Sequence, residues 1–316
     1  MLRFTHSLSL AVRDENGQPV HQEPVRDLRP CYEDLLFSAV CAGKVPNDGA
    51  FPPAIVEPVW RDRRVAGLTL ALTGFQKFYG LPIFADRVLE VLVAKKLVEE
   101  AGQRERYCWQ IEASEAAGDG RRGKLAVSLA RRPYPFCDAV AGPGGSSDGP
   151  FPVSVSAALL GELREATASS LELERADILT GRLFRAPGGQ VSLRVSGRIP
   201  APESSASRAH VTFSPLTFQA VQQELARQTG EETVCGWHHS HPPPCGRDCL
   251  LVAPACQTAN LFFSLADRTV HRASFPAPYM IGLVSGKQAG KRADDPGFQA
   301  YGWQEGVIQE VSFATF

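Results

Sequence analysis

Alternating apolar and polar side chains at residues 3–12 predict a strand with one buried face. Residues 104–113 alternate in the same way. Between these segments, residues 31–43 predict a short helix that ends at Gly43, and residues 84–101 predict a longer helix because their apolar side chains share one broad face. We therefore expect the first part of the chain to be an α+β unit.

The second half of the chain has a different order of elements. Residues 155–170 predict a helix, and residues 178–185 and 190–201 flank a Pro-Gly-Gly turn, which predicts a β-hairpin. Another helix is expected to end at Gly230. Apolar or alternating segments predict the remaining strands, at residues 233–237, 278–286 and 301–316. The order favours an α+β fold with a mixed sheet and flanking helices.

Two segments rich in small and polar residues interrupt these patterns, at residues 115–123 and 141–150. The second is rich in Gly, Ser and Pro, which is typical of a linker or a long exposed loop. The sequence therefore predicts two domains, residues 1–145 and 151–316. The first carries no motif with a recognisable chemistry, so we interpret it as an accessory or partner-binding α+β domain.

The composition of the chain excludes several classes of protein. Apolar residues make up 44% of the 316 residues, which is enough for a substantial core, and the net charge is −1. A balanced charge without a dense basic block disfavours nucleic acid as a partner. No long apolar run indicates a membrane span or a secretory signal, so we expect a cytoplasmic protein.

The cysteines fall into two groups. A disulfide framework is not expected in a long chain without a secretory signal. One group lies beside a histidine cluster and indicates a metal site; its members are Cys235, Cys245, Cys249 and Cys256. The other group is expected to consist of small buried side chains: Cys31, Cys41, Cys108 and Cys137.

The run WHHSHP follows directly on an apolar strand. Because side chains alternate along a strand, His239 and His241 project to one side, within reach of one metal ion, and His238 points to the other. Downstream, Ser264 and Asp267 share a face if they open a helix. Asp267 then completes a set of two histidines and one carboxylate, which is typical of catalytic rather than structural zinc.

The string His-Ser-His-Pro followed by Ser-x-x-Asp resembles the JAMM motif of the JAB/MPN metalloprotease domain. The resemblance covers residues 151–290 and includes the Gly-Trp strand before the histidines. It implies a cytidine-deaminase-like mixed sheet and a zinc peptidase or isopeptidase that acts on ubiquitin or ubiquitin-like conjugates. Similar bacterial domains accompany E1-like and E2-like proteins, some in antiviral defence, and the resemblance implies such partners here.

The same resemblance implies a role for each motif residue. His239, His241 and Asp267 would bind Zn²⁺, which would activate a water molecule and polarise the scissile carbonyl. Ser264 would donate a hydrogen bond to the developing oxyanion. Because Ser-x-x-Asp is also similar to a capping box, Ser264 is expected to cap its own helix as well.

The stretch between the second histidine and the serine, residues 242–263, is longer than in the family. It is rich in Pro and contains Cys245, Cys249 and Cys256, whose spacing suits a second, structural zinc ion. A group of buried free thiols is the alternative interpretation. Candidates for the fourth ligand are Cys235, His238 and Asp248.

The family's general base is a glutamate on its first strand, three residues before a glycine. In this chain Ile178 stands at that distance from Gly181. Asp177 is one position away, and it would need a bulge because a slip of one residue turns a side chain to the other face. Glu174 is four positions before Ile178, but its longer side chain could reach the site. Two other interpretations stay open. The base could come from the first domain, or the domain could bind partners without catalysis.

Three hypotheses for the function follow. The first is a deconjugating zinc enzyme of a bacterial ubiquitin-like system. The second is a non-catalytic JAB/MPN scaffold that binds partners of the same system, which the displaced acid favours. The third is an amidohydrolase of small substrates on the same domain.

Overall fold

The chain is a mixed α+β protein in the computed structural model, as its sequence predicts. Its described residues form two units, one made of residues up to 133 with 305–307, the other of residues 134–304 with 308–316. The structure describes residues 6–98, 106–115, 125–138, 151–170, 172–201, 205–206, 211–227, 230–243, 257–292 and 294–316.

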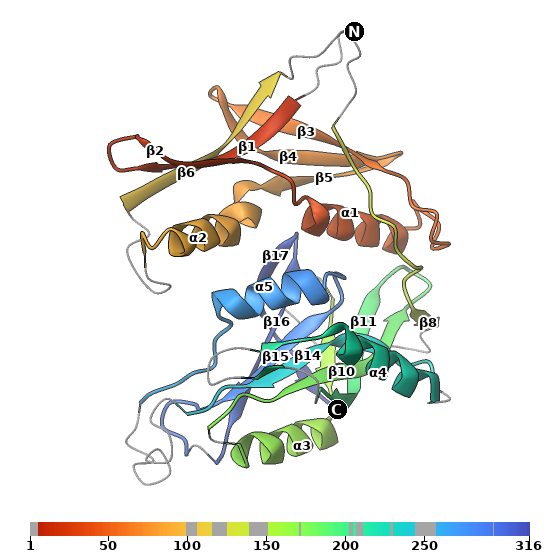
Figure 1. Ribbon diagram of the computed structural model, residues 1–316. Helices are drawn as coiled ribbons and strands as arrows, with labels where there is room; N and C mark the ends of the chain where they lie inside the picture. The colour runs from red at the N-terminus through yellow and green to blue at the C-terminus, as the bar shows by residue number, and fades with distance from the viewer. Residues whose placement is uncertain are drawn as a thin grey trace. The chain divides into compact units, whose positions relative to one another are not determined.

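The first unit contains antiparallel sheets with the strand orders β2-β1-β6 and β5-β4-β3-β7 (Figure 1). The strand predicted near the start of the chain is confirmed: Leu8, Leu10 and Val12 are buried on β1, whereas Ser7 is exposed. The elements are β1 (His6–Asp14), β2 (Pro19–Pro24), α1 (Arg29–Cys41), β3 (Ala54–Arg61), β4 (Arg64–Leu72), β5 (Phe75–Gly80), η1 (Leu81–Phe84), α2 (Ala85–Ala94), β6 (Tyr107–Glu115) and β7 (Ala126–Val127).

The helix predicted over residues 84–101 is shorter in the structure, because α2 ends at Ala94. Its apolar face is buried as expected, with Val88 and Leu92 among the buried side chains. The pattern of apolar residues continues past the helix, but Lys96 has a φ of 57°. This left-handed conformation stops the helix, and periodicity alone does not reveal it.

The second unit is built around one mixed sheet with the order β17-β16-β15-β14-β10-β11-β9-β18, and β8 also pairs with β10. β14 runs antiparallel to β10 and parallel to β15. The elements are β8 (Phe136–Asp138), β9 (Val153–Val155), α3 (Ala157–Ala168), β10 (Ala176–Arg185), β11 (Val191–Pro200), β12 (Ser205–Ala206), β13 (Val211–Thr212), α4 (Pro215–Arg227), β14 (Thr233–Ser240), α5 (Leu265–Ser274), β15 (Ile281–Gly286), β16 (Gly297–Gln304), β17 (Val307–Val311) and β18 (Ala314–Thr315).

The helices of the second unit cover both faces of this sheet: α3 lies on one face and α5 on the other (Figure 1). We call the α5 side the front face and the α3 side the back face. An aromatic core fills the front, where Trp237 of β14 stacks on Phe275 with ring centroids 5.9 Å apart. Val221 of α4 belongs to the same core. The predicted hairpin is confirmed as β10–β11.

The predicted domain boundary falls in residues 141–150, which lie outside the described residues, and it stays a prediction. Residues 136–138 pair with β10 and therefore belong to the second unit. No helix in the described ranges is both long and apolar enough to cross a lipid bilayer.

Candidate metal centre

β14 carries the histidines at the middle of the mixed sheet, between β10 and β15. His239 is on the front face, and His241 follows the last residue of the strand, where its amide still donates to the Ser285 carbonyl at 2.8 Å. His239 is fully buried and His241 is 8% exposed. The strand therefore presents two imidazoles on one side, as their spacing predicts.

α5 supplies the acidic side chain. Ser264 is its N-cap, and a capping box is present: the Asp267 amide donates to Ser264 Oγ at 3.1 Å, and the Ser264 amide donates to Asp267 Oδ2 at 2.8 Å. The expected N-cap role of Ser264 is thereby confirmed. The capping box also holds the Asp267 carboxylate at the start of the helix.

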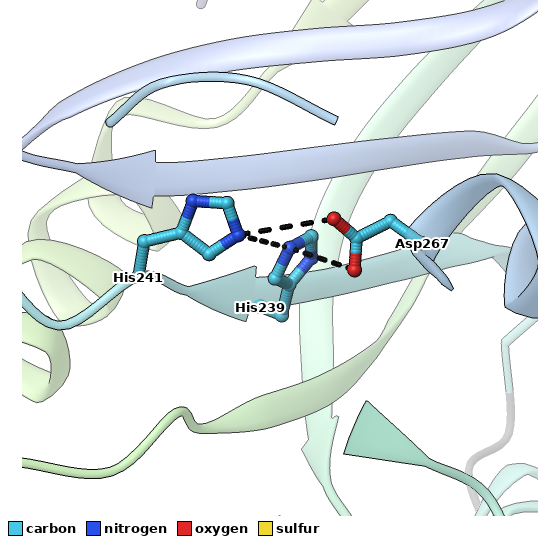
Figure 2. Close-up of side chains that lie close together, drawn as sticks. All are labelled: His239, His241 and Asp267. Atoms are coloured by element: carbon cyan, nitrogen blue, oxygen red, sulfur yellow. Dashed lines mark hydrogen bonds and ion pairs between the residues drawn. The ribbon is translucent and has the colours of Figure 1, made fainter. Parts of the chain in front are cut away.

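These three side chains point toward one another (Figure 2). His239 Nε2 lies 3.0 Å from His241 Nε2 and 3.3 Å from Asp267 Oδ1, and His241 Nε2 lies 3.8 Å from Asp267 Oδ2. Ligand atoms around tetrahedral zinc, with bonds near 2.0–2.1 Å, lie roughly 3.3 Å apart. The observed spacings are those of a group that could hold a metal ion.

The surroundings favour the metal-binding protonation state at His239 and Asp267, whereas they favour the protonated form at His241. Burial lowers the pKa of His239, which favours the neutral imidazole that a metal needs. Burial acts to raise the pKa of Asp267, but the neighbouring His239 and His241 outweigh it and lower that pKa, so the carboxylate is ionised. Burial also acts to lower the pKa of His241, but the hydrogen bond to Asp267 outweighs it and raises the pKa.

Asn260 orients His241. The Nδ1–H of His241 donates to the Asn260 carbonyl oxygen at 2.6 Å, which leaves Nε2 as the lone-pair nitrogen that faces His239. The Asn260 side chain donates to the Pro242 carbonyl at 2.8 Å and accepts from the Lys287 amide at 2.6 Å. Two imidazole nitrogens that face each other beside a carboxylate can each give a lone pair to a cation, so this donor set fits a metal ion.

Sequence reasoning missed Asn260, because this residue lies in the long 242–263 stretch, where no spacing rule applies. The contact between Trp237 and His239 was also missed. Their rings stack with centroids 4.5 Å apart and an interplanar angle of 15°. The parity of β14 could have revealed it, because residues two apart on a strand share a face.

Glu174 lies beside the cluster. The register of β10 and β14 pairs Ala176 with His239, and the Ser240 amide donates to the Arg175 carbonyl at 2.9 Å, which places Glu174 level with His241. Glu174 is 6% exposed, and its Oε2 has no hydrogen-bond partner among the described residues. Burial raises its pKa to about 7, against the opposing effect of His241.

Asp177, the other predicted base, does not reach the cluster. It lies on the back face, where its carboxylate accepts hydrogen bonds from His238 Nδ1 at 3.0 Å and Arg198 Nη1 at 2.8 Å. Burial acts to raise the pKa of Asp177, but these two partners outweigh it and lower the pKa. Glu174 and Asp177 are three positions apart, an odd offset, so extended backbone turns their side chains to opposite faces.

The predicted second zinc site depends on Cys245, Cys249 and Cys256, which lie outside the described residues, as does Asp248. Cys235 is described and is a buried free thiol. His238 cannot serve as the fourth ligand in this arrangement, because Asp177 and Ser285 occupy its two ring nitrogens. The second zinc site stays a prediction.

No protein-family model matches the chain. Over 116 residues it is 33% identical to 26S proteasome non-ATPase regulatory subunit 14 of Dictyostelium discoideum, a JAMM/MPN protein. The match covers 36% of this chain and 35% of that protein, so the chain spans about a third of that relative's length. It supports a JAB/MPN-type domain in that part of the chain.

A solved structure, protein DSY2949 from Desulfitobacterium hafniense, aligns with 52% of this chain and 92% of its own length. The sequence identity is 16% and the TM-score is 0.36. A likeness at this level carries no argument about function.

Proposed function

We propose that this chain is a zinc-dependent peptidase or isopeptidase that removes or matures a ubiquitin-like modifier. The observation that carries the proposal is the convergence of His239, His241 and Asp267 at metal-ligand distances. Two imidazoles with one carboxylate are a ligand set of catalytic zinc sites. The partial similarity to a JAMM/MPN protein supports the same class of hydrolase.

In this proposal His239, His241 and Asp267 hold the zinc ion, which supplies Lewis-acid activation of a water molecule and of the scissile carbonyl. Glu174 is the general base, which accepts a proton from the attacking water and passes it to the leaving amine. Its unpartnered Oε2 is available for that proton.

Ser264 is the proposed hydrogen-bond donor to the oxyanion. In the capping box its oxygen accepts the Asp267 amide, and this bond does not use the hydroxyl proton. The hydroxyl can therefore donate to an oxygen on which negative charge develops. Its place one turn before Asp267 puts this donor next to the metal ligands.

The proposed substrates are a ubiquitin-like protein and its conjugates, and the proposed partners are E1-like and E2-like proteins of a bacterial conjugation system, including systems of antiviral defence. The support is the motif resemblance and the similarity to a subunit of the 26S proteasome. Residues 1–145 are proposed to recognise the modifier or a partner. We propose the cytoplasm as the place of action.

The test is cleavage of a ubiquitin-like fusion protein, together with measurement of bound zinc. We expect His239→Ala and Asp267→Ala each to abolish both zinc binding and cleavage. Asp294→Ala, which removes an exposed carboxylate, is the control and should change neither. A chelator should stop wild-type cleavage, and added zinc should restore it. Cleavage that persists without zinc, or in His239→Ala, would refute the proposal.

A non-catalytic scaffold is the second candidate. The observation in its favour is that Glu174 does not have the family's spacing from Gly181. A scaffold would bind zinc and partner proteins but leave every ubiquitin-like fusion intact.

A further inference from the structure

His238 lies directly behind the metal cluster, on the back face of β14, and is fully buried. Both of its ring nitrogens have partners: Nδ1 donates to Asp177 Oδ2 at 3.0 Å, and Nε2 lies 2.8 Å from Ser285 Oγ. These contacts join three neighbouring strands, because Asp177 belongs to β10 and Ser285 to β15.

The contacts continue beyond this trio on both sides. Arg198 of β11 donates to Asp177 Oδ1 at 2.8 Å. On the other side, Ser285 Oγ lies 2.6 Å from Thr167 Oγ1 of α3. We call this connected set the back-face chain; its members are Arg198, Asp177, His238, Ser285 and Thr167. It links four strands and a helix through side chains that are buried for the most part.

The back-face chain has the order of a Ser-His-Asp triad, but nucleophilic catalysis does not fit it. Ser285 is fully buried, and its hydroxyl is already within hydrogen-bond distance of Thr167. A nucleophile must be reached by its substrate. The arrangement therefore calls for a structural role connected with β14.

A bulge interrupts the register between β14 and β10, and a structural role for the back-face chain relates to it. Leu179 of β10 pairs with Gly236, but the next residue, Thr180, pairs with Val234, so Cys235 is an extra residue between the two pairs. Gly236 has a φ of 144°, which few other residues adopt. A bulge of this kind separates the register of the strand's first half from that of its second half. The histidine-bearing half therefore needs contacts of its own to set its register.

His238 and His239 are neighbouring residues of the same type, so these two side chains do not by themselves distinguish the observed register from a slip of one residue. The packing of Trp237 in the front core favours the observed register, and the partners of His238 act in addition to it. A slip of one residue would turn His238 and Ser240 to the front and His239 to the back. The front face would then present one imidazole and one hydroxyl in place of the two imidazoles of His239 and His241. The same slip would break the Asp177–His238 contact, and a buried carboxylate that loses its partner is costly.

We propose that the back-face chain is a register lock: Asp177 and Ser285 hold His238 behind the sheet and so position His239 and His241 as metal ligands. This inference rests on the metal-binding part of the proposed function and does not depend on cleavage. His238, Asp177 and Ser285 are positioning residues, because their side chains act on the metal ligands through the backbone that carries those ligands. Asp177, one of the two acids that the sequence indicates as a candidate base, is thereby assigned a positioning role.

The test uses Ser285→Ala, which removes one partner of His238, and Asp177→Asn, which removes the charge of the other partner. Both changes keep the surroundings close to the original size. Ser154→Ala is the matched control, because Ser154 is a buried serine of the same sheet that donates to the Leu193 carbonyl at 3.3 Å. Zn²⁺ affinity is measured by competition with a chromophoric chelator. The absorption spectrum of bound Co²⁺ reports the ligand set.

We expect both lock variants to bind Zn²⁺ about 10- to 100-fold more weakly, as when residues that orient metal ligands are changed. Their Co²⁺ spectra should shift, whereas Ser154→Ala should keep the wild-type affinity and spectrum even where its melting temperature falls. If Asp177→Asn does not fold, Ser285→Ala decides the question. Unchanged affinity and spectrum in a folded lock variant would overturn the inference and leave the proposed function intact. A wild-type chain without zinc affinity would overturn both.

Discussion

The two faces of β14 present the same kind of side chain in opposite circumstances. On the back, His238 has a partner for each ring nitrogen, and its carboxylate partner is itself paired with Arg198. On the front, His239 Nε2 faces another imidazole and a carboxylate, and its Nδ1 has no partner among the described residues. Of three histidines within four positions, one has separate protein partners for both ring nitrogens, and the other two have Nε2 atoms that face each other and Asp267.

This difference shows that the hydrogen-bond partners of a buried histidine, more than its residue type, distinguish a structural histidine from a candidate ligand. Buried polar groups in folded proteins are almost always paired, so an unpaired one points to a ligand or an ion. The acids divide in the same way: Asp177 is paired on the back, and Glu174 has an unpartnered oxygen at the front.

The largest effect on the difference between the two faces is expected when Glu174, the acid at the front face, is replaced. We expect Glu174→Gln to reduce kcat for cleavage of a ubiquitin-like fusion by about 10²- to 10⁴-fold, because general base catalysis contributes on that scale. Bound zinc should stay at the wild-type level, because Glu174 is not one of the three clustered residues. Steady-state kinetics and metal analysis measure the two effects separately.

Glu172→Gln is the matched control, since it makes the same change at an exposed position two residues earlier. It should leave both kcat and zinc content unchanged. A Glu174→Gln variant that retains wild-type kcat would remove this residue as the base.

A second test uses the pH dependence of stability in the metal-free chain. Burial raises the pKa of Glu174 to about 7 from its ordinary 4.5, so its stabilising contribution is complete below the ordinary value and is lost as pH rises through 7. Glu174→Gln cannot ionise. Relative to wild type, we expect it to gain about 3 kcal/mol between pH 4 and pH 8.

Urea unfolding with a chelator present, at several pH values, measures this difference. Glu172→Gln should follow wild type throughout. Parallel curves for wild type and Glu174→Gln would show that the carboxylate is not buried at the front face as described.

The smallest expected effect is that of changing Asn260, which lies in the segment between β14 and α5 and contacts His241. Asn260→Ala should weaken Zn²⁺ binding about 10- to 100-fold, because it releases the backbone that orients His241. Asn260→Asp keeps an acceptor for the Lys287 amide but loses the donor to Pro242. Chelator competition on both variants, with Ser154→Ala as control, separates the two contacts. Wild-type affinity in Asn260→Ala would show that the side chain does not position His241.

Much of the fold was predictable, because hydrophobic periodicity is a property of each element. The alternation of β1, the β10–β11 hairpin and the helix that begins after Ser264 all follow from local patterns. The end of α2 was predicted too late, because apolar side chains continue beyond the left-handed Lys96. Backbone conformation ended that helix at a point where the spacing of the apolar residues continues.

The base could not be identified from spacing, for a similar reason. Counting back from Gly181 to an acid crosses register shifts, one between Thr180 and Gly181 toward β11 and one between Leu179 and Thr180 toward β14. A rule that assumes a regular ladder does not hold across such irregularities. Only the pairing of Ala176 with His239 shows that Glu174, rather than Asp177, lies beside the cluster.

The sequence by itself determined the relations that lie within one element. His239 and His241 share a face because side chains alternate along a strand, and Ser264 and Asp267 meet because they are three apart at the start of a helix. Tertiary structure alone decided the relations between elements: that β14 meets α5, that Glu174 and Asn260 join the cluster, and that His238 is held behind it. The physical reason is that periodicity sets directions inside an element, whereas register, bulges and packing set which elements meet.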